Sequence, residues 1–266
     1  YSSLGITLKE LGRSEEGIEK CSYAIKIDPE YAEGYFNLGL ILYTTGNLNS
    51  ALENVRLASS IDPSSGIIKK LLAILETKKI RENNHFNEKL KTLPTTIILK
   101  RKVENELIIK LKNMKALQLN KIKDPSFGNA KGSDYNLFDD KDPLIKAVAK
   151  DLTKIINEEI GSKIYIDDSF YTILGAGGRV DRHNHLTPQD RKFCNDFNIN
   201  KYSLVYYLMT GDQKSSEPGI LKLYDPIESY LPMDGMMIMF PADREHSAKY
   251  NGNKDRMIIG VNFYAL

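Results

Sequence analysis

The chain has 266 residues, of which 37 are basic and 35 acidic, and its formal charge is +2. A hydrophobic content of 41% with 27% charged residues excludes wholesale disorder, and the near-balanced charge gives no reason to expect nucleic acid or an anionic membrane as a partner. No apolar run is long enough to span a bilayer, so no membrane association is expected. The two cysteines, Cys21 and Cys194, form no disulfide framework, which predicts a reducing, cytoplasmic location.

The N-terminal third carries an internal repeat. Three motifs recur at an offset of 34 positions (38 − 4): Leu4-Gly5 as Leu38-Gly39, Ala24 as Ala58, and Asp28-Pro29 as Asp62-Pro63. Glycine after leucine lets a neighbouring helix approach closely, and Ala51, Val55 and Ala58 form one stripe of a second helix. A 34-residue period with this pattern resembles the tetratricopeptide repeat, TPR.

The TPR resemblance implies helical hairpins over residues 1–91, closed by an amphipathic capping helix from Ile67 to Glu88. Since the chain begins inside a repeat at Tyr1, further repeats are expected upstream. Repeats of this family commonly bind proteins, so a protein or peptide substrate could dock in their groove. A purely structural role is the alternative.

A domain boundary is predicted near residue 92, where Leu93-Pro94 breaks the helical pattern, and it leaves residues 92–266 as the second domain. The segments that follow are predicted, in order, as a strand at Thr95–Leu99, a helix over Glu104–Leu117, a loop over Asp124–Asp142 and a helix from Asp142-Pro143 to about Ile160. Glu104 and Glu106 interrupt the lysines between residues 100 and 123, which favours a solvated helix face over a nucleic-acid patch.

Strands dominate the chain from Lys163 onward. They are predicted around Tyr165–Leu174, Ser203–Leu208, Ile220–Tyr224, Met236–Phe240 and Arg256–Phe263. Short strands with glycine, proline and aspartate between them indicate a sandwich or jelly roll.

Three of the four histidines fall in this half, and His85 is expected at the surface. His183 and His185 are two positions apart, so their side chains are expected on one face of a strand, and His246 follows later in the chain. Imidazole nitrogens suit iron, zinc, copper and nickel, so the three histidines predict a metal site. Asp181, two positions before His183, is an alternative carboxylate ligand.

Arg256 follows His246 by ten positions (256 − 246), and its guanidinium fork could bind a carboxylate. A structural ion pair with Asp255 or Glu245 is the alternative role for this arginine.

The order and spacing of several motifs carry a second resemblance. They are Gly177-Gly178, His183-Asn184-His185, Ser203–Leu208, Pro218–Pro226, Asp234–Pro241, His246 and Arg256–Asn262. Together they resemble the Fe(II)/2-oxoglutarate-dependent oxygenases, in particular the prolyl-hydroxylase-like branch and a bacterial and phage group. The resemblance implies an α+β two-domain chain, in which the TPR hairpins precede a double-stranded β-helix of the jelly-roll or cupin-like type with flanking helices.

Carried over by position, the resemblance implies that His183, His185 and His246 hold Fe(II). It also implies that Arg256 and Tyr207 hold the cosubstrate 2-oxoglutarate, with O2 as the oxidant, while simple core packing is the alternative for Tyr207. Most relatives carry Asp or Glu where this chain has His185, and many carry a small hydroxyl residue where it has Ile258.

The implied activity is a dioxygenase that hydroxylates a residue, with proline favoured, of a protein or peptide. The alternatives are a TPR interaction protein with a degenerate, metal-binding β-helix, and a three-histidine iron dioxygenase that uses no 2-oxoglutarate. The Leu186–Tyr202 segment, in which Cys194 is expected to lie in a charged loop, is predicted to be a substrate lid.

Overall fold

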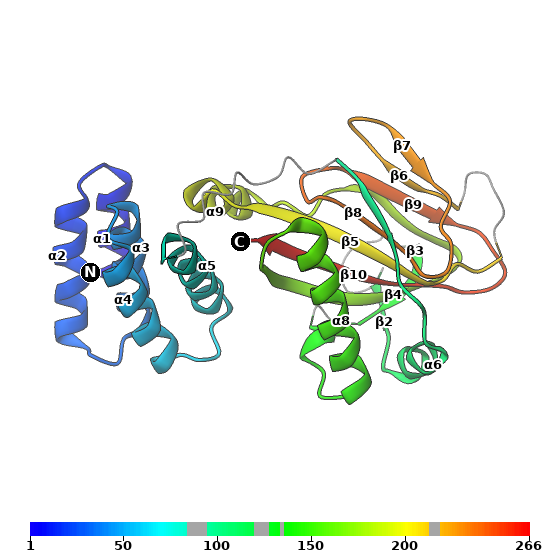
Figure 1. Cartoon of the computed structure of the whole chain (residues 1–266), viewed down its shortest axis with the longest axis horizontal. Coiled ribbons are helices and arrows are strands. Elements are labelled where there is room, and N and C mark those ends of the chain that lie inside the picture. The colour runs from blue at the N-terminus through cyan, green and yellow to red at the C-terminus, as the bar shows by residue number, and fades with distance from the viewer. Residues whose placement is uncertain (84–94, 120–127, 134–135, 213–218) are drawn as a thin grey trace. The chain divides into compact units, whose positions relative to one another are not determined.

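The computed structural model describes residues 1–83, 95–119, 128–133, 136–212 and 219–266. Two compact units make up the chain, Tyr1–Leu90 together with Leu266, and Lys91–Ala265. The first is helical and the second is built on an antiparallel sheet, so the expected α+β two-domain fold class is confirmed (Figure 1). His85 and Leu93-Pro94, where we predict a surface histidine and a helix break, lie outside the described residues.

Five helices form the described part of the N-terminal unit. They are α1 (Ser2–Glu10), α2 (Ser14–Ile27), α3 (Ala32–Thr44), α4 (Leu48–Ile61) and α5 (Gly66–Asn83). The repeated glycines sit where helices touch: a Cβ on Gly5 would lie 2.5 Å from Cys21 Sγ, and one on Gly39 would lie 2.6 Å from Val55 Cγ2. Val55 is fully buried, as are its neighbours Ala51 and Ala58 in the predicted stripe. The close approach of paired helices therefore explains why glycine recurs at both positions.

The C-terminal unit is built on an antiparallel sheet whose main path runs β1-β8-β5-β10-β4-β9-β6-β7, with β2 and β3 joined to it through β4. The strands are β1 (Ile97–Lys100), β2 (Leu117–Gln118), β3 (Gly128–Gly132), β4 (Ile164–His183), β5 (Asn200–Met209), β6 (Leu221–Leu223), β7 (Glu228–Tyr230), β8 (Met236–Pro241), β9 (His246–Tyr250) and β10 (Arg256–Ala265).

The sheet curls on itself into the expected double-stranded β-helix. Tyr207 of β5, Leu223 of β6 and Phe240 of β8 belong to one buried cluster, although β10, β4 and β9 lie between β5 and β6 along the sheet. This contact across the sheet encloses an inner face. At the two ends of the sheet, Thr96 beside β1 donates a hydrogen bond to Glu228 of β7 (2.5 Å), and Arg244 Nη1 donates to both residues (2.5 and 2.9 Å).

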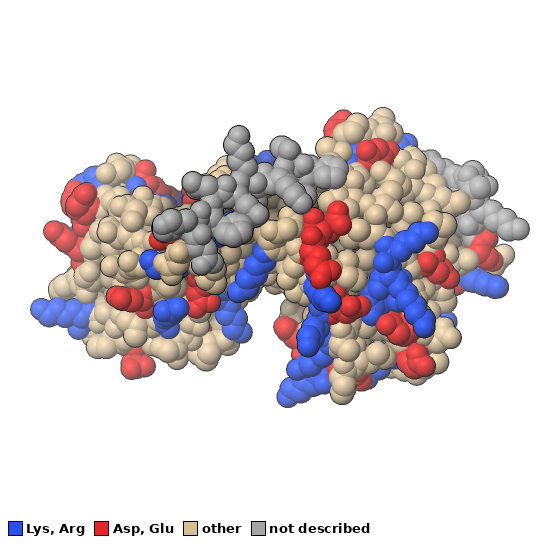
Figure 2. Space-filling model, viewed as in Figure 1, with Lys and Arg blue, Asp and Glu red and all other residues tan. Residues whose placement is uncertain are grey.

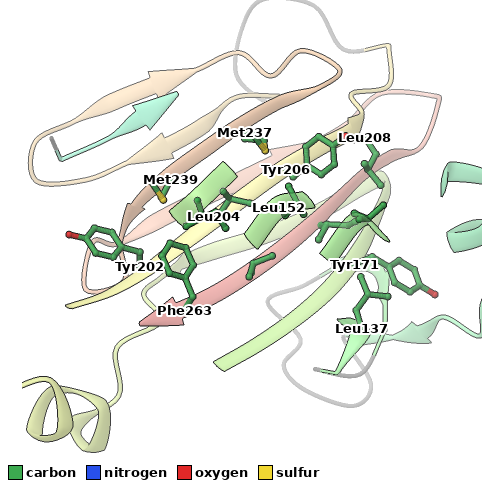
Figure 3. Close-up of a cluster of buried hydrophobic side chains, with 14 of the residues drawn as sticks. Leu137, Leu152, Tyr171, Tyr202, Leu204, Tyr206, Leu208, Met237, Met239 and Phe263 are labelled. Atoms are coloured by element: carbon green, nitrogen blue, oxygen red, sulfur yellow. The ribbon is translucent and has the colours of Figure 1, made fainter. Parts of the chain in front are cut away.

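Helices α6 (Asn105–Asn113) and α8 (Pro143–Ile160) cover the outer face of the sheet. Leu152 of α8 packs there with Leu204 of β5 and Met237 of β8 in the main hydrophobic core (Figure 3). The bounds of α8 agree with the prediction because Asp142 caps the helix, accepting a hydrogen bond from the backbone N–H of Leu144 (2.9 Å).

The sequence-based prediction of secondary structure is wrong for three segments outside the histidines. The first is the length of the helix over Glu104–Leu117: α6 ends at Asn113, and Leu117 is in β2. Apolar spacing cannot mark this end, because Met114 turns to an extended conformation while keeping its apolar side chain in the core.

In the other two segments, residues predicted as loops form regular secondary structure. The predicted loop over Asp124–Asp142 contains β3 and the 3-10 turn η2 (Leu137–Asp139); β3 is formed by pairing with β4, which its glycine-rich sequence does not signal. Residues around Cys194 form helix α9 (Pro188–Phe197), which a capping box at Thr187 begins.

Candidate functional site

His183 and His246 lie opposite each other on neighbouring strands. His183 is the last residue of β4, His246 is the first of β9, and the two are register partners with ring centroids 4.3 Å apart. The sequence did not signal β9, so the pairing that joins these residues across 63 positions (246 − 183) was not predicted.

His185 reaches the same place from outside the sheet. The expectation that it shares a strand face with His183 is wrong, because β4 ends at His183; instead the His185 backbone N–H donates to the Ala242 carbonyl (2.8 Å). Its ring centroid lies 4.9 Å from that of His183 and 5.0 Å from that of His246. One ring nitrogen from each histidine lies within 4.8 Å of the other two, so the structure brings the three predicted ligands together.

The surroundings of His183 and His246 suit metal ligation. His183 Nδ1 lies 2.8 Å from the Asp181 carbonyl, which can only accept, so Nδ1 donates there and Nε2 is the ring nitrogen left for a metal. Burial, together with the charges of His183 and His185, holds the pKa of His246 well below its usual range, and its buried Nδ1 has no hydrogen-bond partner among the described residues. Neutral imidazole is the form that binds a metal.

Asp181 contributes its backbone to the site but not its carboxylate. That carboxylate lies 3.5 Å from Arg179 Nε, with about half of each side chain exposed. In the part of the chain that the structure describes, the group able to hold a metal consists of the three histidines without Asp181.

A cavity of about 230 Å³ joins the histidines to Arg256 and Tyr207. The Arg256 side chain is buried, its Nε donates to the Thr210 carbonyl (3.1 Å), and its guanidinium carbon lies 4.5 Å from the centre of the Tyr250 ring. Burial lowers the pKa of this guanidinium, and within the part of the chain that the structure describes its buried Nη2 has no hydrogen-bond partner.

Among the described residues, neither Glu245 nor Asp255 forms an ion pair with Arg256. Glu245 instead bonds to Arg182, whose Nε lies 2.6 Å from its carboxylate, and no ion pair joins Asp255 to Arg256 within that part of the chain. The cavity therefore contains a buried cationic fork with an unused donor.

Tyr207 lies beside Arg256 and is 3% exposed. Burial raises the pKa of its hydroxyl far above the usual range, which the charge of Arg256 only partly offsets, so the phenol stays neutral. Its ring also belongs to the inner apolar cluster, so core packing and a place in the cavity wall both apply. Ile258, its register partner on β10, also lines the cavity.

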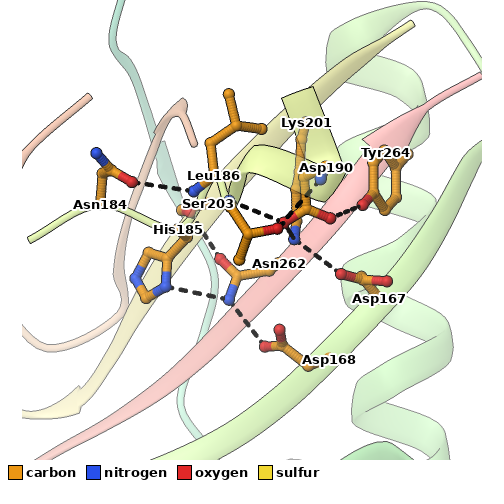
Figure 4. A network of polar contacts seen from close by, with 11 residues as sticks. Asp167, Asp168, Asn184, His185, Leu186, Asp190, Lys201, Ser203, Asn262 and Tyr264 are labelled. Atoms are coloured by element: carbon orange, nitrogen blue, oxygen red, sulfur yellow. Dashed lines mark hydrogen bonds and ion pairs between the residues drawn. The ribbon is translucent and has the colours of Figure 1, made fainter. Parts of the chain in front are cut away.

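Three polar residues of the cavity wall were not predicted. Asn262 Nδ2 lies 3.5 Å from His185 Nδ1 and donates to Asp168 Oδ1 (2.8 Å), while its Oδ1 accepts from Ser203 Oγ (2.6 Å; Figure 4). Ser203 and Asn262 could have been noticed in the sequence, because each is a polar residue inside an apolar strand.

The repeat region matches known family models. A TPR repeat model matches residues 5–46 and a tetratricopeptide repeat model matches residues 32–65. The curated "Small glutamine-rich tetratricopeptide repeat-containing protein 2" of Mycosarcoma maydis is 30% identical over 73 residues, 27% of this chain. The match spans 21% of that relative's length.

The fold resembles several solved structures at low sequence identity. The viral collagen prolyl hydroxylase of Paramecium Bursaria Chlorella virus-1, solved as a 2-oxoglutarate complex, has a TM-score of 0.46 and 11% identity over 65% of this chain and 97% of that one. A Trichoplax adhaerens prolyl hydroxylase in complex with a hypoxia inducible factor peptide fragment has a TM-score of 0.46 and 14% identity, over 77% and 95%. HygX of Streptomyces hygroscopicus, with nickel and 2-oxoglutarate bound, has a TM-score of 0.48 and 9% identity, over 71% and 85%.

None of the helices in the described residues combines the length and apolar character needed to cross a bilayer.

Proposed function

We propose that the C-terminal unit is an Fe(II)- and 2-oxoglutarate-dependent dioxygenase. One observation carries the proposal: three histidines able to share a metal and a buried guanidinium with an unused donor line the same cavity. A metal site alone would need no arginine, and a structural arginine would need a partner for its Nη2. The pair of features suits a cosubstrate that binds a metal at one end and presents a carboxylate at the other.

His183, His185 and His246 would hold the metal. The donor set suits Fe(II), and the unpartnered nitrogen of buried His246 is an atom that a ligand in the site can satisfy. When bound, Fe(II) together with 2-oxoglutarate and O2 supplies the oxidising power that hydroxylates a C–H bond. The chain positions the three imidazoles, of which His246 is buried and His183 and His185 are half-buried.

Arg256 and Tyr207 would hold the far carboxylate of 2-oxoglutarate. A guanidinium taken out of water is costly unless an anion compensates it, and a carboxylate can accept two parallel hydrogen bonds from its fork. The neutral Tyr207 hydroxyl, buried beside Arg256, can donate to the same carboxylate. These two residues would therefore both bind and orient the cosubstrate.

We propose a residue of a protein or peptide, with proline favoured, as the substrate. The TPR hairpins support this choice, because such repeats commonly present a docking surface for polypeptides. We propose the reducing cytoplasm as the location, which suits the two free thiols, Cys21 and Cys194.

Two observations favour a second candidate, a TPR interaction protein whose β-helix binds metal without hydroxylating. His185 stands where a carboxylate is usual, which raises the charge of a metal site by one, and the apolar Ile258 lines the cavity where a hydroxyl is common. A three-histidine iron dioxygenase that needs no 2-oxoglutarate would keep the metal but leave Arg256 unused.

Anaerobic addition of Fe(II) and then 2-oxoglutarate tests the proposal. We expect a visible charge-transfer band that Arg256→Ala abolishes and Arg179→Ala, at an arginine with a half-exposed side chain, leaves unchanged. Admission of O2 should then release succinate. Tight Zn(II) binding without any band would contradict the proposal and favour the second candidate, whereas turnover without 2-oxoglutarate would favour the third.

A further inference from the structure

His185 is the one histidine of the three that no strand holds. It lies beyond the end of β4, and its backbone hydrogen bond to the Ala242 carbonyl fixes the main chain at one point. Two residues later Thr187 caps helix α9. The place of His185 therefore depends on what fixes the start of that helix.

Asp190 closes the first turn of α9 onto its cap. Its carboxylate accepts hydrogen bonds from the Thr187 backbone N–H (3.0 Å) and hydroxyl (2.7 Å), while the Asp190 N–H donates to Thr187 Oγ1 (3.1 Å). Such a capping box makes the cap and the first turn one rigid piece.

The same carboxylate fastens this piece to the sheet. Asp190 Oδ2 lies 3.1 Å from Lys201 Nζ on β5, and Asp190 Oδ1 accepts a hydrogen bond from the Tyr264 hydroxyl on β10 (Figure 4). The Lys201 side chain is 5% exposed and that of Asp190 12% exposed, so water screens their attraction little. Burial raises the pKa of Asp190, but hydrogen bonds from Tyr264 and Thr187 and the charge of Lys201 outweigh it and lower the pKa to about 2.

Lys201 has a second carboxylate partner, which separates two roles within the network. Asp167 Oδ2, on β4, lies 2.8 Å from Lys201 Nζ. If either aspartate is substituted, the other one still neutralises the buried Lys201 ammonium. Only the loss of Asp190 also releases the helix that follows His185.

We infer that Asp190 is a positioning residue for His185, holding its imidazole beside His183 and His246 by fastening the cap of α9 to β5 and β10. The inference rests on the proposed metal role of the three histidines. It also makes the start of α9 a fixed support, in contrast to the lid that we predict for this segment from the sequence.

Titration of the metal-free full chain with Co(II), followed by calorimetry and the visible ligand-field spectrum, tests the inference. We expect Asp190→Ala to weaken Co(II) binding by roughly 10- to 100-fold, the usual effect of removing a residue that orients a metal ligand. Asp167→Ala, the matched control, should change the affinity by less than about threefold, because it leaves the α9 attachment intact. Tyr264→Phe, which removes one hydrogen bond to Asp190 and keeps the ring, should weaken binding by an intermediate factor.

A double-mutant cycle separates positioning from general destabilisation. In a His185→Ala background, Asp190→Ala should cause no further loss of Co(II) affinity, since the residue through which it acts is gone. A further loss as large as that in the wild-type background would overturn the inference, as would equal effects of Asp190→Ala and Asp167→Ala.

Failure of the metal site itself has a different signature. If the wild-type chain binds no Co(II), or if His183→Ala binds it as tightly as wild type does, the proposed metal centre is wrong and the inference falls with it. If the wild type and His183→Ala behave as expected but Asp190→Ala binds like wild type, the positioning role alone is wrong.

Discussion

His183 and His246 are register partners on β4 and β9, with ring centroids 4.3 Å apart. A ladder of backbone hydrogen bonds thus places the strands that carry two of the three imidazoles, while the third comes from a segment anchored by a buried ion pair. The candidate site is partly preorganised, which lowers the conformational cost of binding.

Metal should stabilise the folded chain. Because the unfolded chain lacks the three-histidine arrangement, a metal at 100 times its Kd should add about 2.7 kcal/mol to the free energy of unfolding. Thermal melts with and without Zn(II) measure this effect. His246→Ala should remove the metal-dependent shift, and a shift of wild-type size in that variant would contradict the assignment.

Arg256→Met should separate function from stability. We expect 2-oxoglutarate binding, measured by calorimetry on the metal-loaded chain, to be lost. The free energy of unfolding without ligand should stay unchanged or rise by about 1–4 kcal/mol, because methionine removes a buried charge that no described carboxylate pairs with.

Arg244→Met provides the matched comparison for Arg256→Met. Arg244 is also buried but is bonded to Glu228 and Thr96, so its loss should cost about 1.5–3 kcal/mol by removing charge-assisted hydrogen bonds to Glu228. Equal destabilisation by the two substitutions would show that Arg256 is a structural residue.

Low pH should lower the free energy of unfolding by protonating Asp190. Its pKa is lowered in the folded state from 3.8 to about 2, so its contribution, about 2 kcal/mol, is present above pH 4 and is lost as the pH falls toward 2. Urea unfolding at pH 5 and pH 2.5 should show a smaller loss of stability on acidification for Asp190→Asn than for wild type. Equal losses would mean that other carboxylates account for the acid sensitivity.

Gly39→Ala should destabilise the TPR hairpins by about 1–3 kcal/mol, because the new Cβ would lie 2.6 Å from Val55 Cγ2 and 3.1 Å from the Ala51 carbonyl. Gly66→Ala is the control, since a Cβ there meets nothing within 4 Å. Far-UV circular dichroism melts compare the two, and identical melting temperatures would refute close helix packing at Gly39.

The sequence was most informative where local chemistry decides the structure. The repeat glycines, the Asp142 cap and the apolar runs of β5, β8 and β10 each specify an element through their own residues. By contrast β3 and β9 exist because β4 pairs with them, and neither has an apolar alternation that would reveal it. Tertiary pairing overrides local propensity at such strands.

The candidate site divides in the same way. The three histidines and Arg256 were identified from their residue types and order along the chain, and Tyr207 from the family resemblance; all five line one cavity. Asn262 and Asp190 were missed, because their importance comes from neighbours 77 and 74 positions away, His185 and Tyr264. A local sequence pattern cannot predict contacts over such a separation.

The hydrogen bonds among Thr96, Glu228 and Arg244 bear on where the C-terminal unit can be cut from the chain. Strands β1 and β7 stand at opposite ends of the sheet path, and side chains, without a backbone ladder, tie one to the other across 132 positions. A fragment that began after Lys100 would lose both β1 and this tie, and it would leave β8 as a bare edge of the sheet. A fragment that keeps this tie must therefore include Thr95 and Thr96, which lie well ahead of every histidine of the site.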